Sequence, residues 1–184
     1  MGIYVTNPET LSIGLLVARI VFGLLMAAHG TQKLFGWFGG YGLNATGEFM
    51  AQLGFSPGRA FATLASATEV ASGLLVALGF LGPIGPALMI AVMIVAAITV
   101  HWNNGLFATT NGVEMPLLYS TAAFGFALTG YGQYSLDALL GIGGRWPVWS
   151  TWTILAVGIA GGLANAAFGN RNKAAKARSG DLAR

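Results

Sequence analysis

The sequence contains no cysteine among its 184 residues. This absence excludes thiol–disulfide exchange, ligation of an iron–sulfur cluster by thiolates, and a redox-active CxxC motif. Charge is scarce as well, because Lys, Arg, Asp and Glu together make up 8% of the chain, against about 25% in a typical soluble domain. With a mean hydropathy of +0.68, the composition indicates an integral membrane protein.

Signatures of several enzyme classes are also missing. The chain has no Walker A loop, GxSxG elbow, HExxH helix or Rossmann glycine motif in its proper context. Its net charge of +3 comes mostly from basic residues near the C-terminus, so the charge gives no reason to expect a nucleic-acid partner. We expect the lipid membrane itself to be the first partner.

Five apolar stretches cover residues 11–30, 61–82, 84–100, 116–130 and 148–168. One membrane span needs about 20 residues, so the chain has room for a single membrane domain, predicted over residues 1–170 and followed by a basic cytoplasmic tail, 171–184. The fourth stretch is short and could be re-entrant, but we prefer five spans. The predicted fold class is all-α transmembrane, with an antiparallel helix bundle.

The segment between the first two stretches differs from both spans and loops. It is too polar to cross a membrane and too apolar for an ordinary loop, and its aromatic residues suit the headgroup region. Phe49, Met50 and Leu53 would share one face of a helix. We therefore predict an interfacial segment with a short helix there.

Basic residues predict the orientation of the spans. Five spans with the C-terminus inside place the N-terminus outside and leave Arg145 as the basic residue of the outside loops. The inside then holds most of the positive charge, as the positive-inside rule requires; its basic residues are Lys33, Arg59, Arg171, Lys173, Lys176, Arg178 and Arg184.

Two opposite charges, Arg19 and Glu69, stand near the middle of apolar stretches. An ionisable side chain in hydrocarbon is costly unless it is paired or faces a polar cavity. Counting helix rise from the inner ends of the two spans predicts an Arg19–Glu69 ion pair. This pair would either lock two helices together or let Glu69 accept a proton beside a bound quinol, and both residues are candidate catalytic residues.

A second group of candidates lies at the predicted inner ends of the spans. His29 and Lys33 are spaced i, i+4 at the end of the first predicted helix, His101 and Trp102 end the third, and Glu114 precedes the fourth. These types suit a quinone head group, with histidine donating a hydrogen bond and Glu114 accepting a proton. Interfacial anchoring is the structural alternative. Haem ligation by the two histidines and a transition-metal site of His29, His101 and Glu114 are weaker alternatives, because the ligand types fit but the spacing is uninformative, and no metal site is predicted.

Two remaining patterns are interpreted as structural. Ser135 and Asp137 fit the start of a helix, with Ser135 as the capping residue. Gly158, Gly162 and Ala166 form a ridge of small residues on the last stretch, which would dock this helix on the bundle or join two copies of the chain.

The chain resembles the DoxX family of small bacterial membrane proteins. The matching pieces are Arg19, the run GLLMAAHGTQKLFG from Gly23, EVASGLL from Glu69, Asn104-Gly105, Glu114, and GYGQYSLD from Gly130. The resemblance covers roughly Leu11 to Leu140. It implies a four-helix bundle core, to which the last stretch adds a fifth transmembrane helix.

The resemblance also implies a location and a function. The location is the bacterial plasma membrane, and the residues carried over are Arg19, His29, Lys33, Glu69 and Glu114. The implied function is the quinone-interacting or membrane-anchoring component of a thiosulfate/quinone or oxidative-stress redox complex, as one subunit of a quinone-linked oxidoreductase with a soluble partner. The alternatives are a non-catalytic platform that recruits a cytoplasmic enzyme and a small-solute or proton carrier gated by the Arg19–Glu69 pair.

Overall fold

The computed structural model describes residues 7–181, and these residues form helices, turns and loops with no strand. The predicted all-α fold is therefore confirmed. The α-helices are α1 (Pro8–Phe35), α2 (Gly42–Gln52), α3 (Gly58–Leu78), α4 (Ile84–Ala96), α5 (Glu114–Thr129), α6 (Leu136–Leu139) and α7 (Val148–Asp181). A π-helical turn, Ala97–His101, prolongs α4.

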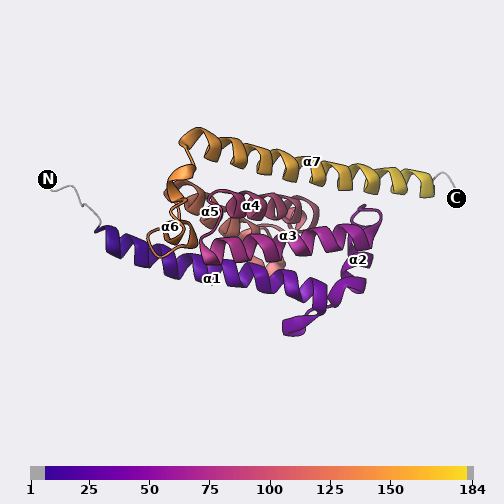
Figure 1. Ribbon diagram of the computed structural model, residues 1–184. Coiled ribbons are helices and arrows are strands. Elements are labelled where there is room, and N and C mark those ends of the chain that lie inside the picture. Colours follow the sequence, from indigo (N-terminus) through magenta and orange to yellow (C-terminus); the bar gives the residue numbers. More distant parts are fainter. Residues whose placement is uncertain (1–6, 182–184) are drawn as a thin grey trace.

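The long helices run side by side along one axis (Figure 1). Helix α1 packs on α3, α4 lies between α3, α5 and α7, and α2 contacts α3. Helix α1 begins and α7 ends at opposite ends of the molecule (Figure 1), so the chain passes along the bundle an odd number of times. We call the end that holds α2 and the end of α7 the basic end, and the end that holds residues 79–83 and 130–147 the loop end.

In the described part of the chain, four helices are long and apolar enough to cross a membrane: Pro8–Phe35, Gly58–Leu78, Ile84–Asn104 and Val148–Ser179. The fourth predicted span corresponds to α5, which has 16 residues and is therefore about 24 Å long. This is shorter than the hydrocarbon core of a bilayer, about 30 Å. Helix α5 still packs in the bundle against α4, so the five-span topology stays a prediction that the odd number of passes supports.

Helix α1 extends further at its C-terminal end than the sequence analysis predicts. It starts at Pro8 behind the cap Asn7, and it ends where Gly36 turns into the left-handed region at φ 75°. The predicted end is Gly30. The additional turn moves the end of α1 past Lys33 to Phe35, so Arg19 lies further from this end than the prediction assumes.

The predicted interfacial segment contains a short 3-10 turn, Trp37–Gly39, and the helix α2. Aromatic side chains around the turn are largely exposed, from 57% for Trp37 to 90% for Tyr41. The predicted short helix is present, and it begins at Gly42, earlier than its apolar face alone indicates.

Glycines bring α1 and α3 into backbone contact. A Cβ at Gly23 would lie 2.5 Å from the Ala77 nitrogen, and one at Gly73 would lie 2.5 Å from the Gly23 oxygen. A Cβ at Gly30 would lie 2.6 Å from the Ser66 oxygen. Since lipid offers little hydrophobic drive for helices to associate, such close packing of small residues is what holds them together.

Small residues also dock α7. A Cβ at Gly158 would lie 2.7 Å from the Ala87 oxygen, and one at Gly162 would lie 2.7 Å from the Ala91 oxygen. The predicted ridge therefore faces α4 within the bundle. Helix α7 continues through the basic residues to Asp181, so the segment predicted as a separate tail is helical as far as it is described, and Arg184 lies outside the described residues.

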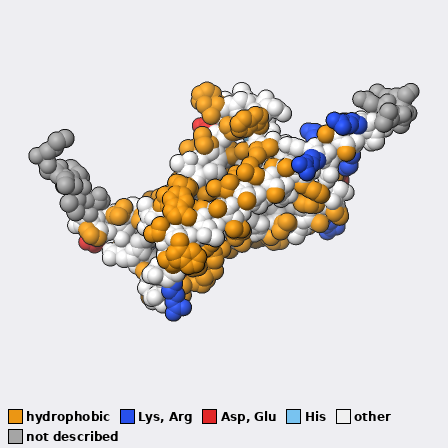
Figure 2. All heavy atoms as spheres, turned by 90° about the horizontal axis from the view of Figure 1, so that it is seen from above, with side chains coloured by type: hydrophobic (Ala, Val, Ile, Leu, Met, Phe, Trp, Pro, Cys, Tyr) orange, Lys and Arg blue, Asp and Glu red, His pale blue; other side chains and the backbone are white. Residues whose placement is uncertain are grey.

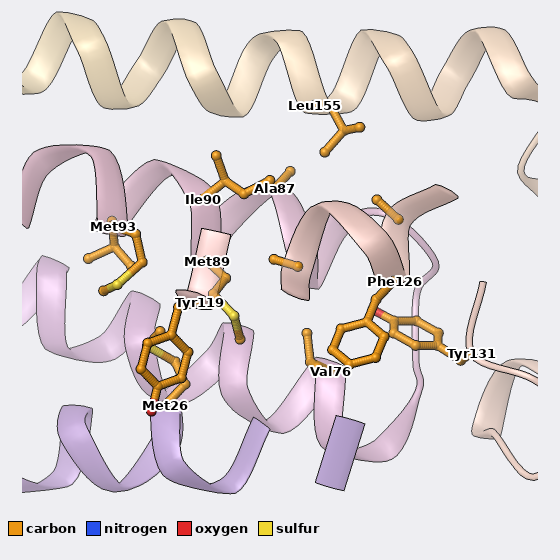
Figure 3. Close-up of a cluster of buried hydrophobic side chains, with 13 residues drawn as sticks. Met26, Val76, Ala87, Met89, Ile90, Met93, Tyr119, Phe126, Tyr131 and Leu155 are labelled. Carbon is orange, nitrogen blue, oxygen red and sulfur yellow. The ribbon is translucent and has the colours of Figure 1, made fainter. Parts of the chain in front are cut away.

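Between the helices lies a core of buried side chains (Figure 3). Met26 from α1 and Met89 from α4 are fully buried, and Tyr119 and Phe126 of α5 are 2% and 5% exposed. Leu155 brings α7 into the same cluster. This core fixes the depth at which the polar side chains of α1, α3 and α5 face one another.

Candidate functional site

An ion pair inside the bundle joins α1 and α3. The Lys33 ammonium donates a hydrogen bond to Glu69 Oε1. The Glu69 side chain is 1% exposed and that of Lys33 is 36% exposed, so the carboxylate is buried while the ammonium reaches the surface. A buried carboxylate is stable only with such a partner.

The helix register explains why Glu69 meets Lys33. Gly23 faces Gly73 and Ala77, and Gly30 faces Ser66 and Val70, so Glu69 lies level with His29. Lys33 lies one turn further along α1, about 6 Å away. Because side chains on a helix lean toward its N-terminus, the Lys33 side chain points back toward Glu69.

The predicted Arg19–Glu69 pair is wrong. The same register places Arg19 beside Gly79, where a Cβ would lie 3.3 Å from Arg19 Cζ. That level is ten residues from Glu69, about 15 Å along α3. The prediction measured depth from helix ends that the structure places elsewhere, since α1 extends past Gly30 to Phe35. The carrier gate that depended on this pair is overturned with it.

Arg19 instead closes the loop end of the bundle. Its guanidinium donates to the carbonyl oxygens of Ala77 and Tyr134, and the residue is 2% exposed. Ala77 lies in the last turn of α3, where the helix dipole favours a positive charge and the carbonyls need donors. Arg19 therefore ties α1 to the end of α3 and to the loop after α5.

Tyr119 of α5 completes the polar group around Glu69. Its ring lies edge-on to His29, with centroids 5.9 Å apart, and the register of α1 and α3 places His29 level with Glu69. Within the described residues, Glu69 Oε2 and the Tyr119 hydroxyl are buried and have no hydrogen-bonding partner. Tyr119 is not among the predicted site residues, because a tyrosine in an apolar stretch resembles a core residue.

The other predicted ligand-binding residues lie at the two ends of the loop that joins α4 to α5, with His101 closing the π-helical turn and Glu114 opening α5. His101 Nδ1 lies 2.8 Å from the Asn111 carbonyl oxygen, and Glu114 Oε2 accepts a hydrogen bond from the Ala108 nitrogen at 2.7 Å. Trp102 is 69% exposed. The side chains of His101 and Glu114 therefore stabilise the loop between them by contacting its backbone. In contrast, His29, Lys33 and Glu69 lie at neighbouring levels of α1 and α3.

Over residues 7–181, no three His, Cys, Asp or Glu side chains come together in a way that could hold a metal ion. We call the group formed by His29, Lys33, Glu69 and Tyr119 the polar site. Its chemistry is that of proton transfer and hydrogen bonding, because it combines a carboxylate, an ammonium, a phenol and an imidazole.

Asp137 and Tyr131 organise the loop end. Ser135 caps α6 as predicted, accepting from the Ala138 nitrogen at 3.2 Å. The Asp137 carboxylate accepts from the nitrogens of Leu81 and Gly82 at 2.8 and 2.7 Å. Burial, and then the nearby Asp137 charge, raise the pKa of the Tyr131 phenol, which stays protonated and donates to the Gly82 oxygen.

Comparison with known proteins gives one match. The sequence model of the DoxX family matches residues 14–102, which run from α1 through the turn after α4. Arg19, His29, Lys33 and Glu69 lie inside the match, as do His101 and Trp102, whereas Glu114 and Tyr119 lie beyond it. No curated protein and no solved structure matches the chain. Within residues 7–181, four helices are able to cross a membrane, and the family match covers the first three of them, so the chain is a membrane protein that carries a DoxX domain over residues 14–102.

Proposed function

We propose that the polar site binds the head group of a quinone or quinol, and that the protein is the membrane component of a quinone-linked redox complex with a soluble partner. The observation that carries this proposal is the pair of unpartnered buried atoms, Glu69 Oε2 and the Tyr119 hydroxyl. Each buried polar atom without a partner costs about 1–3 kcal/mol. A ligand with a carbonyl or hydroxyl group would supply the missing hydrogen bonds.

The side chains of the polar site fit this chemistry. When a quinol is oxidised in this complex, its two electrons would pass to the soluble partner, one of its protons to Glu69 and the other to the surface by way of His29. Glu69 can accept one proton, and Lys33 stabilises the carboxylate before the transfer. The Tyr119 hydroxyl can donate to a ring oxygen, while Met26 and Phe22 provide apolar walls beside it. Exposed His29 offers a proton route from the surface of the bundle.

Quinone retention tests the proposal. Protein solubilised from native membranes is expected to contain extractable quinone, and Tyr119→Phe is expected to retain about five- to tenfold less, since one hydrogen bond is worth about 1–1.5 kcal/mol. Tyr134→Phe is the matched control, because it removes the same hydroxyl from an exposed ring at the loop end. Wild-type protein without quinone, or equal retention by both variants, would contradict the proposal.

We further propose that the basic end faces the cytoplasm of a bacterial cell. Arg59, Arg171, Lys173, Lys176 and Arg178 gather at the basic end with Lys33, whereas the loop end carries Arg145. This asymmetry follows the positive-inside rule. Figure 2 shows the Lys and Arg side chains clustered where α7 ends.

Single introduced cysteines test this orientation cleanly, because the native sequence has none. In intact cells, a membrane-impermeant maleimide is expected to label Gly144→Cys at the loop end and to leave Ala175→Cys unlabelled until the cells are opened. Both positions are exposed. Labelling of Ala175→Cys in intact cells would reverse the proposed orientation.

A further inference from the structure

A cavity of about 180 Å³ lies between α3, α4 and α7, away from the polar site. Its walls are mainly apolar, with Phe55 and Phe61 at the basic end and Leu64, Leu88 and Val95 along its length. Leu64 is 58% exposed and Gly161 of α7 is also exposed, so the cavity is a groove that opens sideways toward lipid. Since a dry cavity of about 150 Å³ admits benzene, this groove can accept a segment of hydrocarbon chain.

One side chain that lines the groove is polar and has no hydrogen bond to the described part of the chain. Asn165 of α7 lines it and is partly buried, and within residues 7–181 its amide makes no hydrogen bond. The other polar side chain, Thr68, is already satisfied, because its hydroxyl donates to the Leu64 oxygen at 2.8 Å. An amide without a hydrogen bond at membrane depth raises the free energy of the folded protein. A ligand with a hydrogen-bond acceptor would therefore bind favourably in the groove.

Positive charge begins where the groove ends. At 100° per residue, Lys173 and Lys176 lie on the same side of α7 as Asn165, and Arg171 and Arg178 lie on the opposite side. Lys173 is about 12 Å beyond Asn165, and its side chain leans back toward it. Helix α7 is held there by Gly54, whose Cβ would lie 2.8 Å from the Lys173 nitrogen.

The surroundings leave this charge largely unneutralised. Residues 36–59 and 168–179 contain five basic residues and one acidic residue, Glu48, and Glu48 is exposed on α2. An occupant that carries a negative charge is therefore favoured at this end of the groove.

We propose that the groove between α3 and α7 binds one anionic phospholipid of the leaflet at the basic end. One acyl chain fills the groove beside Phe61 and Leu64. The Asn165 amide donates to the ester carbonyl, and Lys173 pairs with the phosphate. This inference is independent of the polar site and of the quinone proposal.

Native mass spectrometry of the purified protein, incubated with equal amounts of phosphatidylglycerol and phosphatidylcholine, tests the site. Wild-type protein is expected to retain one phosphatidylglycerol in preference to phosphatidylcholine. Gly161→Leu is expected to abolish retention, because a Cβ at Gly161 meets nothing within 4 Å and the added side chain occupies the groove. Asn165→Leu is expected to weaken retention of both lipids.

Two single-charge variants distinguish binding at a specific site from general electrostatic attraction to anionic lipid. Lys173→Gln is expected to lower the affinity for phosphatidylglycerol about fivefold, the effect of one basic residue near an anionic surface. Arg178→Gln is the charge-matched control on the opposite side of α7 and should leave the affinity unchanged. Equal losses in both variants, equal retention of the two lipids, or undiminished retention by Gly161→Leu would each overturn the proposal.

Discussion

Replacement of Arg19 by methionine is expected to lower the free energy of unfolding by about 3 kcal/mol. The guanidinium donates to the Ala77 and Tyr134 carbonyl oxygens, and hydrogen bonds from charged groups contribute about 1.5–3 kcal/mol each. Methionine fills a similar volume but leaves both carbonyls without this donor. Unfolding in mixed micelles, followed by circular dichroism, measures the loss.

Arg19→Lys serves as the control for charge alone. Lysine keeps a positive charge beside the last turn of α3, but its single ammonium lacks the forked geometry that reaches two carbonyls. We expect it to recover about half of the lost stability. A change below about 0.5 kcal/mol for Arg19→Met, which is the range of an ordinary surface substitution, would show that Arg19 does not hold the loop end.

Replacement of Lys33 by methionine is expected to lower the free energy of unfolding by about 3 kcal/mol. It leaves the Glu69 carboxylate, 1% exposed, without its partner, and breaking a buried ion pair on one side costs about 3–5 kcal/mol. The lower end of this range applies because the Lys33 side chain is 36% exposed and water screens part of the interaction. Unfolding in mixed micelles, followed by circular dichroism, measures this loss of stability.

Lys176→Met is the matched control, since it makes the same chemical change on an exposed side chain and should change the stability by less than about 0.5 kcal/mol. A similar small effect for Lys33→Met would mean that the Glu69 carboxylate does not depend on Lys33.

Much of the helical architecture follows from the sequence alone. The apolar stretches predict the long helices because hydrocarbon requires continuous backbone hydrogen bonding, and the ridge of Gly158, Gly162 and Ala166 predicts close docking of α7. The end of α1 does not follow, because Thr31, Gln32 and Lys33 are polar and resemble the start of a loop. Gly36, which stops the helix in the left-handed conformation, is one of several glycines there.

The residues of the candidate site follow from the sequence only in part, and their pairing does not. His29, Lys33 and Glu69 are residues that the sequence analysis selects, but the pairing depends on helix register, which Gly23, Gly30 and Gly73 determine through backbone contact. Composition does not reveal that register. His101 and Glu114 have suitable chemistry, yet their side chains bind backbone atoms of the 102–114 loop, and an irregular loop of this kind has no periodic pattern to predict it.

Two double-mutant cycles measured side by side address the central claim, that Glu69 interacts with Lys33 and not with Arg19. Each cycle compares the unfolding free energies of two single variants with that of the double variant. For Lys33→Met with Glu69→Gln, we expect the double variant to be more stable than the sum predicts, by about 1–3 kcal/mol. For Arg19→Met with Glu69→Gln, we expect additivity within about 0.5 kcal/mol. The reverse result, with coupling at Arg19 and additivity at Lys33, would contradict the account.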